Sequence, residues 1–335
     1  MTIREMVENR EEELLSPFAS LSKYSLGRDI TEEECDIRPV YQRDRDRILH
    51  SKSFRRLKDK TQVFLTPEGD HYRTRLTHTL EVSQNARTIA KALRLNEDLT
   101  EAIALGHDLG HTPFGHAGER ALDRCCVDGF RHNEQSLRVV EVLEKDGKGL
   151  NLTKEVRDGI LNHKTKSMPK TLEGKIVRLS DKIAYIHHDM DDAIRAKVLS
   201  EEDIPKELRN TLGFSTTRRL NTMIHDVITT STGKDDIVMS DEIEKAMFEL
   251  RRFMFENVYL NPVVKQEESK AEKLVESLYE YYLREPERLP EEYKNLMNDK
   301  GVTKDRAVCD FVSSMSDRYA IYVFENLYMP KSWSL

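Results

Sequence analysis

Residues 107–116 read His-Asp-Leu-Gly-His-Thr-Pro-Phe-Gly-His, and this stretch combines three histidines and a carboxylate with residues that interrupt helices. The apolar residues at 102–105 belong to a preceding helix, for which Asn96 is a suitable N-cap. Proline and glycine at 113 and 115 break that helix, and a new one is expected to begin near His116. An adjacent histidine and aspartate at a helix end can direct an imidazole nitrogen and a carboxylate oxygen toward one cation. The stretch therefore predicts two helices that meet at a chemically active turn.

The sequence on both sides of this stretch is patterned for helices. Apolar and small residues recur at helical spacing from Leu76 to Leu93. Helices are also predicted for residues 134–143, for 155–163 with Thr153 as the cap, and for three or four amphipathic segments after residue 241. The segment 175–195 is apolar over most of its circumference, which predicts a central, buried helix. Glycine and proline are scarce, at 14 and 10 of 335 residues, and no alternating strand pattern is present. We therefore predict an all-α fold.

Composition divides the chain into four regions. We expect an acidic, partly ordered N-terminal arm at 1–37, a core at 38–200, a polar, irregular and mobile insertion at 201–240, and a C-terminal helical region packed on the core at 241–335. Residues 38–60 carry nine basic and three acidic side chains, although the whole chain has a net charge of −7. The overall acidity argues against a nucleic-acid coat protein, while the basic stretch leaves weak support for nucleic-acid binding.

Several other protein classes are disfavoured. No run of about 18 apolar residues is present, so we expect no membrane span. The first 13 residues are polar and acidic, unlike a leader peptide. The four cysteines lack C-x-x-C spacing, which disfavours a disulfide framework or a zinc knuckle. We therefore predict a cytoplasmic location.

Histidines and carboxylates are concentrated in the central part of the chain. Nine of the eleven histidines fall between residues 71 and 188. His78 lies on the helix before the opening stretch, and Asp181 lies on the apolar helix, where an unpaired carboxylate would be costly. Together with His107 and Asp108 they form a mixed nitrogen and oxygen ligand set. Such a set suits a divalent cation, namely Mg, Mn, Fe, Co, Ni or Zn.

These four residues match a known signature. The order His78, His107-Asp108, Asp181 resembles that of the HD-domain metal-dependent phosphohydrolases, and the chain is most similar to their dGTPase-like deoxynucleotide triphosphohydrolase branch. The finer resemblance rests on residues 54–63, 75–78, 107–116, 131–136, 181–185 and 315–320. It extends from about residue 40 to residue 330. It implies an HD-domain helical core, with an additional C-terminal helical region, that holds one divalent metal ion.

The resemblance also implies a reaction, in which water attacks the α-phosphorus of a deoxynucleoside triphosphate and releases a deoxynucleoside and tripolyphosphate. It assigns the catalytic role to His116 and Glu119. These residues are three apart at a helix start, so the carboxylate can orient the imidazole as an acid or base. His111 is expected to hold the phosphate chain or to hydrogen-bond a bridging oxygen.

The same resemblance assigns substrate contacts. Tyr185 would pack against the sugar and leave no room for a 2′-hydroxyl, Asp189 would accept a hydrogen bond from the 3′-hydroxyl, and Gln62 would approach the same sugar. Arg75 and Lys182 are expected at the phosphates. Arg55, His132 and Glu134 are further candidates. His163 has no assigned role, and His187 and His188 are treated as packing or polar-network residues.

Two alternatives stay open at this point. One is an HD phosphohydrolase that acts on another nucleotide phosphoester. The other is a nucleotide sensor or a regulator that binds single-stranded nucleic acid and has weak catalysis. The family resemblance further implies a homo-oligomer, either a tetramer or a hexamer, and leaves open a second nucleotide site for an effector.

Overall fold

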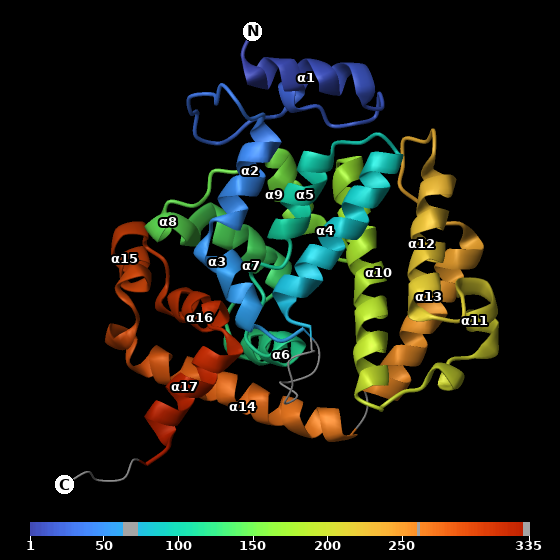
Figure 1. The fold of residues 1–335 in the computed structure, drawn as a ribbon. Coiled ribbons are helices and arrows are strands. Elements are labelled where there is room, and N and C mark those ends of the chain that lie inside the picture. Colours follow the sequence, from blue (N-terminus) through green and yellow to red (C-terminus); the bar gives the residue numbers. More distant parts are fainter. Residues whose placement is uncertain (63–72, 260–261, 331–335) are drawn as a thin grey trace.

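The computed structural model describes residues 1–62, 73–259 and 262–330, and helices dominate these ranges (Figure 1). Within them, β-type pairing is limited to one isolated bridge between Thr61 and Thr74. The prediction of an all-α fold is therefore confirmed.

The main core surrounds α10 (Leu172–Arg195), the long central helix predicted from the apolar segment. Helices α4 (Arg75–Ala92) and α5 (Glu97–Gly106) pack against α10, α2 (Val40–Leu49) covers α5, and α9 (Lys154–Asn162) contacts both α5 and α10. Glycines allow the closest approach: a Cβ on Gly159 would lie 2.5 Å from the Ile103 side chain, and one on Gly106 would lie 2.6 Å from Ile160. The helix that leads into His107 is therefore tightly held.

Side-chain caps explain where several of these helices begin. The side chain of Asn96 accepts a hydrogen bond from the Leu99 amide at 3.1 Å, which confirms the predicted cap of α5. Thr171 caps α10 in the same way through Gly174. Thr153 is the N-cap residue of α9, but its hydroxyl donates instead to Asp44 at 2.7 Å. Local polar residues thus fix the ends of the helices that carry the core.

A second apolar cluster joins the C-terminal helices to α6 (Gly115–Cys125). This cluster contains Ala121 and Leu122 of α6, Leu278 of α14 (Pro262–Arg284) and Phe311 of α16 (Lys304–Ser314). Helices α15 (Glu291–Lys300) and α17 (Asp317–Tyr328) complete it. Ion pairs between α6 and α14 border the cluster: Arg120 with Glu268 and Glu272, and Arg124 with Glu272 and Glu276. The packing of the C-terminal region therefore reaches the helix that begins near His116.

Residues 201–240 differ from the expectation. The sequence predicts an irregular course, but the structure contains α11 (Lys206–Leu212) and α12 (Thr216–Ser231), followed by α13 (Asp241–Met254). Helices α12 and α13 both pack against α10 (Figure 1). Arg219 is buried in α12 and pairs with Glu201 at 2.6 Å. Tertiary packing outweighs the low helix propensity of the serines and threonines here.

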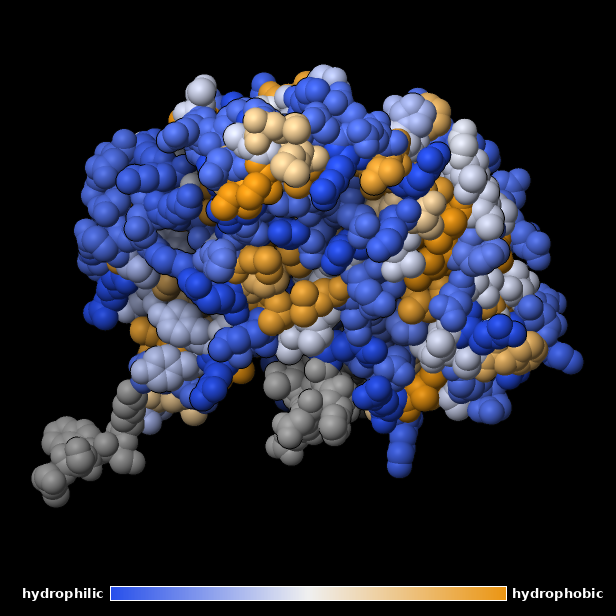
Figure 2. All heavy atoms as spheres, turned by 45° about the horizontal axis from the view of Figure 1, so that its top comes forward, coloured by the Kyte–Doolittle hydropathy of each residue, from blue (hydrophilic) through white to orange (hydrophobic). Residues whose placement is uncertain are grey.

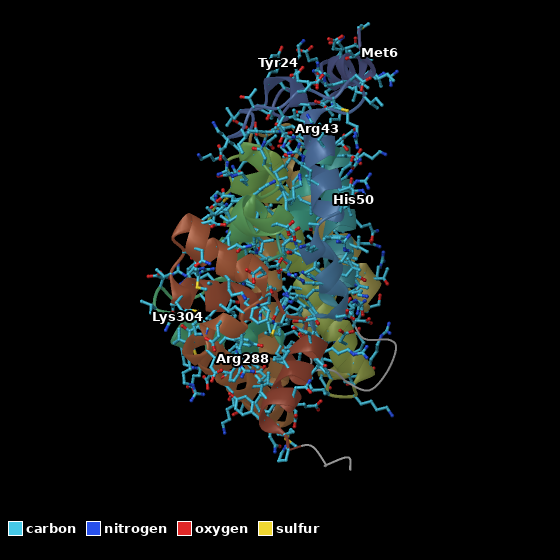
Figure 3. The ribbon with its side chains drawn as sticks, turned by 90° about the vertical axis from the view of Figure 1, so that its left-hand side faces the viewer. Met6, Tyr24, Arg43, His50, Arg288 and Lys304 are labelled. Atoms are coloured by element: carbon cyan, nitrogen blue, oxygen red, sulfur yellow. The ribbon has the colours of Figure 1, made fainter. Side chains whose placement is uncertain are left out.

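The N-terminal arm contains more order than its composition suggests. Helix α1 (Ile3–Leu14) starts with a capping box at Thr2, and the following chain crosses one end of the main core, where Figure 3 shows Met6 and Tyr24. Buried carboxylates anchor this chain: Glu173 accepts from the Ser20 amide at 3.0 Å, and Glu155 accepts from the Leu26 amide at 2.6 Å. The arm is therefore tied to the core by specific hydrogen bonds.

Short helical segments connect these layers. They are η1 (Ser22–Tyr24), α3 (Lys52–Arg56), η2 (Leu57–Asp59), α7 (His132–Arg138), η3 (Val139–Leu143), α8 (Glu144–Gly147), η4 (Glu201–Asp203), η5 (Phe255–Tyr259) and η6 (Pro286–Arg288). The face in Figure 2 is mainly hydrophilic, with hydrophobic residues scattered among charged ones. In the part of the chain that the structure describes, no helix is both long enough and apolar enough to cross a bilayer. The four cysteines are free thiols.

Candidate functional site

A large open cleft of about 1060 Å³ lies between α4, α6, α7, α10 and α13. Most of the residues singled out in the sequence line it: Gln62, Arg75, His78, Asp108, His111, His116, Glu119, His132, Glu134, Asp181, Lys182 and Tyr185. His107 lies directly beside it. Segments more than a hundred residues apart therefore meet in one concave site.

Two predicted substrate residues lie outside this lining. Arg55 is exposed on α3, where its guanidinium approaches the carbonyl of His50 at 3.5 Å. Asp189 is fully buried one helical turn beyond Tyr185, and this burial raises the pKa of its carboxyl well above the ordinary value. The shared helical face of Asp181, Tyr185 and Asp189 thus runs from the cleft into the interior.

The four predicted metal ligands converge at the floor of the cleft. One carboxylate oxygen of Asp181 lies 3.1 Å from His78 Nε2 and 3.7 Å from His107 Nε2. Asp108 Oδ1 lies 3.8 Å from His107 Nε2, and ligand atoms of His78, His107 and Asp108 all lie within 4.8 Å of one another. Two imidazole nitrogens and two carboxylates therefore surround one small volume.

The hydrogen bonding of His107 tests whether this set fits a cation. His107 Nδ1 donates to the carbonyl of Ala104 at 2.6 Å, so Nε2 keeps its lone pair. That Nε2 is buried and has no hydrogen-bond partner among the described residues. A buried acceptor without a donor is costly unless a cation binds it. The donor set therefore fits a divalent metal ion.

Electrostatics keep both aspartates ionised. Burial alone would raise the pKa of Asp181, but the neighbouring imidazoles of His78 and His107 hold this pKa well below its ordinary value. For Asp108, burial is likewise outweighed by Arg75, whose guanidinium donates to Asp108 Oδ2 at 2.7 Å and lowers the pKa. Two carboxylates that are charged at neutral pH provide the negative charge a divalent cation requires.

A second group lies at the mouth of the cleft. His116 Nδ1 lies 3.5 Å from Glu119 Oε2, and the side chain of His116 is 51% exposed. Glu119 also accepts from His132 Nδ1 at 2.9 Å and from Lys164 Nζ at 3.1 Å. Burial raises the pKa of Glu119, but the hydrogen bonds with His116 and His132 keep it far below the usual range. An accessible imidazole is thus oriented by a permanently ionised carboxylate, as proton transfer requires.

His111, His132 and His163 form a buried cluster of imidazole rings. The rings of His111 and His132 are stacked with centroids 4.2 Å apart, and His132 Nε2 lies 3.3 Å from His163 Nε2. Burial lowers the pKa of His163 to about 3 and lowers that of His111 as well. His163, to which the sequence assigns no role, therefore belongs to the cleft wall.

Helix α13 forms a cleft wall that the sequence alone does not reveal. Glu244, Met247, Phe248 and Arg251 lie on one helical face and line the cleft, and Phe248 is 62% exposed. Five basic residues that the sequence does not single out also line the cleft: Arg120, Arg131, Lys164, Lys166 and Arg178. In the sequence, only Phe248 indicates this wall, because it is a large aromatic residue outside the apolar face of the amphipathic segment. An apolar ring and a cationic lining suit a flat, anionic ligand such as a nucleotide.

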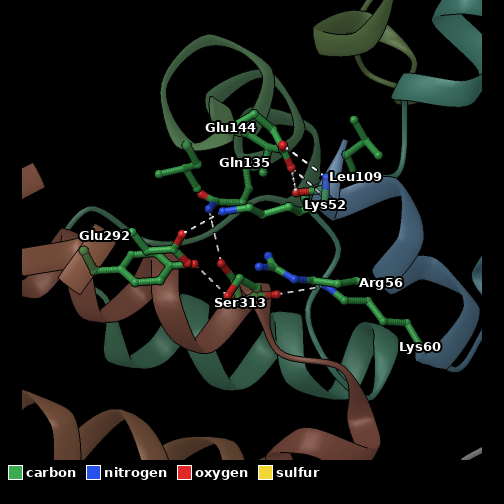
Figure 4. A pocket seen from close by; sticks show the side chains of 14 residues that line it. Lys52, Arg56, Lys60, Leu109, Gln135, Glu144, Glu292 and Ser313 are labelled. Atoms are coloured by element: carbon green, nitrogen blue, oxygen red, sulfur yellow. Dashed lines mark hydrogen bonds and ion pairs between the residues drawn. The ribbon is translucent and has the colours of Figure 1, made fainter. Parts of the chain in front are cut away.

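The turn at 112–115 is held from the C-terminal region. Phe114 has a φ of 60°, which is unfavourable for a residue with a side chain, and its amide donates to Asp317 Oδ1 at 2.9 Å. The other oxygen of Asp317 accepts from the Thr61 amide at 2.9 Å. Lys60 Nζ donates to the carbonyls of His111 and Ser313, beside the small pocket drawn in Figure 4. Residues 315–320, part of the family resemblance, therefore hold the turn between His111 and His116.

Asp317→Ala is expected to destabilise the protein by about 3 kcal/mol, because one buried and one partly buried amide lose a charged acceptor. Urea unfolding followed by circular dichroism measures this loss. Asp59→Ala is the matched control, since Asp59 is exposed in the same region. Equal midpoints for the two variants would show that Asp317 does not hold the turn.

Comparison with known proteins agrees with this geometry. Residues 75–186 match the HD domain, and residues 237–326 match the phosphohydrolase-associated domain. The crystal structure of a phosphohydrolase from Bacteroides thetaiotaomicron is similar in fold, with a TM-score of 0.54 and 18% identity over 85% of this chain and 68% of that one.

Full-length relatives are much closer in sequence. A deoxyguanosinetriphosphate triphosphohydrolase-like protein from Caldanaerobacter subterraneus subsp. tengcongensis is 58% identical over 99% of this chain and 98% of its own length. One from Clostridium tetani is 49% identical over 99% and 97%. The chain belongs to the dGTP triphosphohydrolase-like family of HD-domain phosphohydrolases.

Proposed function

We propose that this protein is a metal-dependent triphosphohydrolase that converts dGTP and other deoxynucleoside triphosphates to the deoxynucleoside and tripolyphosphate. The observation that carries the proposal is one cleft that combines the set His78, His107, Asp108 and Asp181 with the pair His116 and Glu119. The cationic lining of the same cleft matches the charge of a triphosphate.

The four-residue set would hold a divalent cation, either Mg, Mn, Fe, Co, Ni or Zn. Such an ion neutralises charge on phosphate oxygens when it is bound. The chain supplies the remaining contacts to the phosphates. Lys182 and Lys164 line the cleft and bind the phosphate chain, while Arg75 holds Asp108 and faces the same space. His111 contacts a bridging oxygen.

Proton transfer falls to the pair at the mouth of the cleft. His116 is exposed to the cleft and oriented by Glu119, so it moves the proton of the attacking water or of the leaving 5′-oxygen. Glu119 stays ionised because His116, His132 and Lys164 surround it with donors. The carboxylate therefore keeps the imidazole of His116 oriented during turnover.

We assign sugar selection to Tyr185 on α10 and to Gln62, both of which line the cleft. Tyr185 and Gln62 line the cleft and pack against the deoxyribose, leaving no space for a 2′-hydroxyl. Asp189 lies next to Tyr185 on the interior side, and we assign it the hydrogen bond from the 3′-hydroxyl. Arg55 is exposed on α3 and is not among the lining residues, so its contact with substrate stays a prediction.

The decisive measurement is product analysis with four dNTPs and four NTPs against the six metals. We expect tripolyphosphate and deoxynucleoside from the dNTPs, little turnover of the NTPs, and no turnover after chelation of the metal. Phosphorus NMR distinguishes tripolyphosphate from pyrophosphate. Formation of dNMP and pyrophosphate would contradict the proposal.

The two alternatives give different results in the same assay. An HD phosphohydrolase for another phosphoester would hydrolyse dGMP or a cyclic nucleotide faster than dGTP. A sensor or nucleic-acid regulator would bind single-stranded DNA with a steep dependence on salt and would turn over little dNTP. Assembly into a tetramer or hexamer, and a second nucleotide site for an effector, stay predictions that sedimentation and dNTP activation assays can test.

A further inference from the structure

Two side chains behind His78 have no part in the proposed reaction. His188 on α10 is buried, and its Nδ1 lies 3.2 Å from His78 Nδ1, on the side of the ring that faces away from Asp181. His188 Nε2 in turn contacts the carboxylate of Glu81 on α4. The rings of His78 and His188 meet edge to face, with centroids 5.3 Å apart. A continuous chain of contacts thus runs from Glu81 through His188 to His78.

The carboxylate of Glu81 determines which atom is the donor in each of these contacts. A carboxylate only accepts, so His188 Nε2 must carry the proton it shares with Glu81. The Nδ1 of a neutral His188 is then an acceptor, and His78 Nδ1 must donate to it. His78 Nε2 keeps its lone pair, and this is the nitrogen that lies 3.1 Å from Asp181. One carboxylate therefore determines which nitrogen of His78 is free.

Arg73 holds the outer end of the chain. Its Nε donates to both oxygens of Glu81 at 3.3 and 3.2 Å, and its Nη1 donates to Asp191 at 2.8 Å and to Asp192 at 2.9 Å. This network keeps Glu81 in place although its side chain is 36% exposed. The orientation of His188 is therefore set by groups on both α4 and α10.

We infer that Glu81 and His188 form a positioning relay that fixes the tautomer and ring orientation of His78 so that Nε2 faces the cation site. This inference rests on the proposed function, because it assumes that His78 is a metal ligand. His107 offers an internal comparison: its Nδ1 donates to a backbone carbonyl and its Nε2 is free in the same way. A backbone carbonyl thus fixes the tautomer of His107, whereas side chains fix the tautomer of His78.

We expect substitutions in the relay to change the affinity of the protein for Mn²⁺. His188→Leu removes the acceptor for His78 Nδ1 and is expected to weaken Mn²⁺ binding by about 10- to 100-fold, the usual effect of losing such a partner. His188→Asn places an amide oxygen near the former Nδ1 and should restore most of the affinity. Glu81→Ala leaves His188 without a fixed tautomer, and its Mn²⁺ affinity should lie between those of His188→Leu and His188→Asn. Isothermal titration calorimetry of the metal-free, full-length protein with Mn²⁺ measures each value.

His187→Leu is the matched control, because His187 neighbours His188 on α10 and its Nδ1 has no hydrogen-bond partner among the described residues. This control should bind Mn²⁺ like the wild type. Nitrogen-15 spectra of labelled histidine provide a second readout: His78 should carry its proton on Nδ1 in the wild type and lose this preference in His188→Leu.

The outcomes separate the relay from the proposed function. Wild-type protein that binds no Mn²⁺ would refute the metal site itself. Wild-type binding with unchanged affinity in both His188→Leu and Glu81→Ala would overturn the relay alone. If His188→Leu fails to fold, Glu81→Ala and His188→Asn carry the test, because the first changes a half-exposed side chain and the second keeps the polar contact.

Discussion

His107→Ala is expected to abolish stoichiometric metal binding and to reduce dGTP hydrolysis by more than about 100-fold, because loss of a ligand should exceed the effect of losing an outer partner. The change removes a nitrogen that lies within 3.8 Å of both Asp108 and Asp181 and leaves two ionised carboxylates with fewer partners. Calorimetric titration with Mn²⁺ measures binding, and release of tripolyphosphate measures turnover.

The control for this change is His50→Ala, since His50 is exposed at the end of α2, outside the cleft. It should leave both quantities unchanged. Thermal unfolding of the two variants must be compared as well, because His107 also donates to the Ala104 carbonyl. A His107→Ala protein that binds Mn²⁺ with wild-type affinity would exclude His107 as a ligand.

His116→Ala should lower the turnover number by about 100- to 10,000-fold, the usual contribution of a positioned acid or base. Binding of dGTP and of Mn²⁺ should stay close to wild type, because His116 is half exposed at the mouth and belongs to neither the metal set nor the phosphate-binding residues. Single-turnover kinetics gives the chemical step, and equilibrium binding of dGTP to the slow variant gives the affinity.

Glu119→Gln provides a graded comparison. The amide keeps the size of the side chain but loses the charge that orients His116, so turnover should fall less than in His116→Ala. His225→Ala, at an exposed histidine of α12, is the control for both. Full activity in His116→Ala would show that another group moves the proton.

Most of the main core could be predicted from the sequence because periodic apolar residues and caps determine it locally. Asn96 and the apolar face of 175–195 predict α5 and α10 with small errors at their ends. Helix α12 could not be predicted in this way. Its serines and threonines have weak helix propensity, and its order depends on packing against α10 and on the buried pair of Arg219 with Glu201.

The same distinction applies to the site. Histidines and carboxylates with a family spacing predict the four-residue set and the pair His116 and Glu119, and the structure brings both groups together at one cleft. Residues that act through a neighbour carry no such signal. Glu81 and the α13 wall can be recognised only when distant segments have been brought together. Asp317 lies in a segment that shares the family resemblance, but its contact with the turn is visible only in the structure. Arg55 belongs to the basic stretch of the sequence, but it is exposed on α3 and is not among the residues that line the cleft.

The packing of α6 against the C-terminal region constrains how sequences of this family can evolve. By sequence, α6 lies within the HD domain, but its apolar side belongs to the cluster formed with α14 and α16. If recombination replaced the C-terminal domain alone, the new domain would not match the apolar side of α6, the helix that carries His116 and Glu119. The two domains are therefore expected to be inherited as a pair, with substitutions on α6 matched by substitutions on α14.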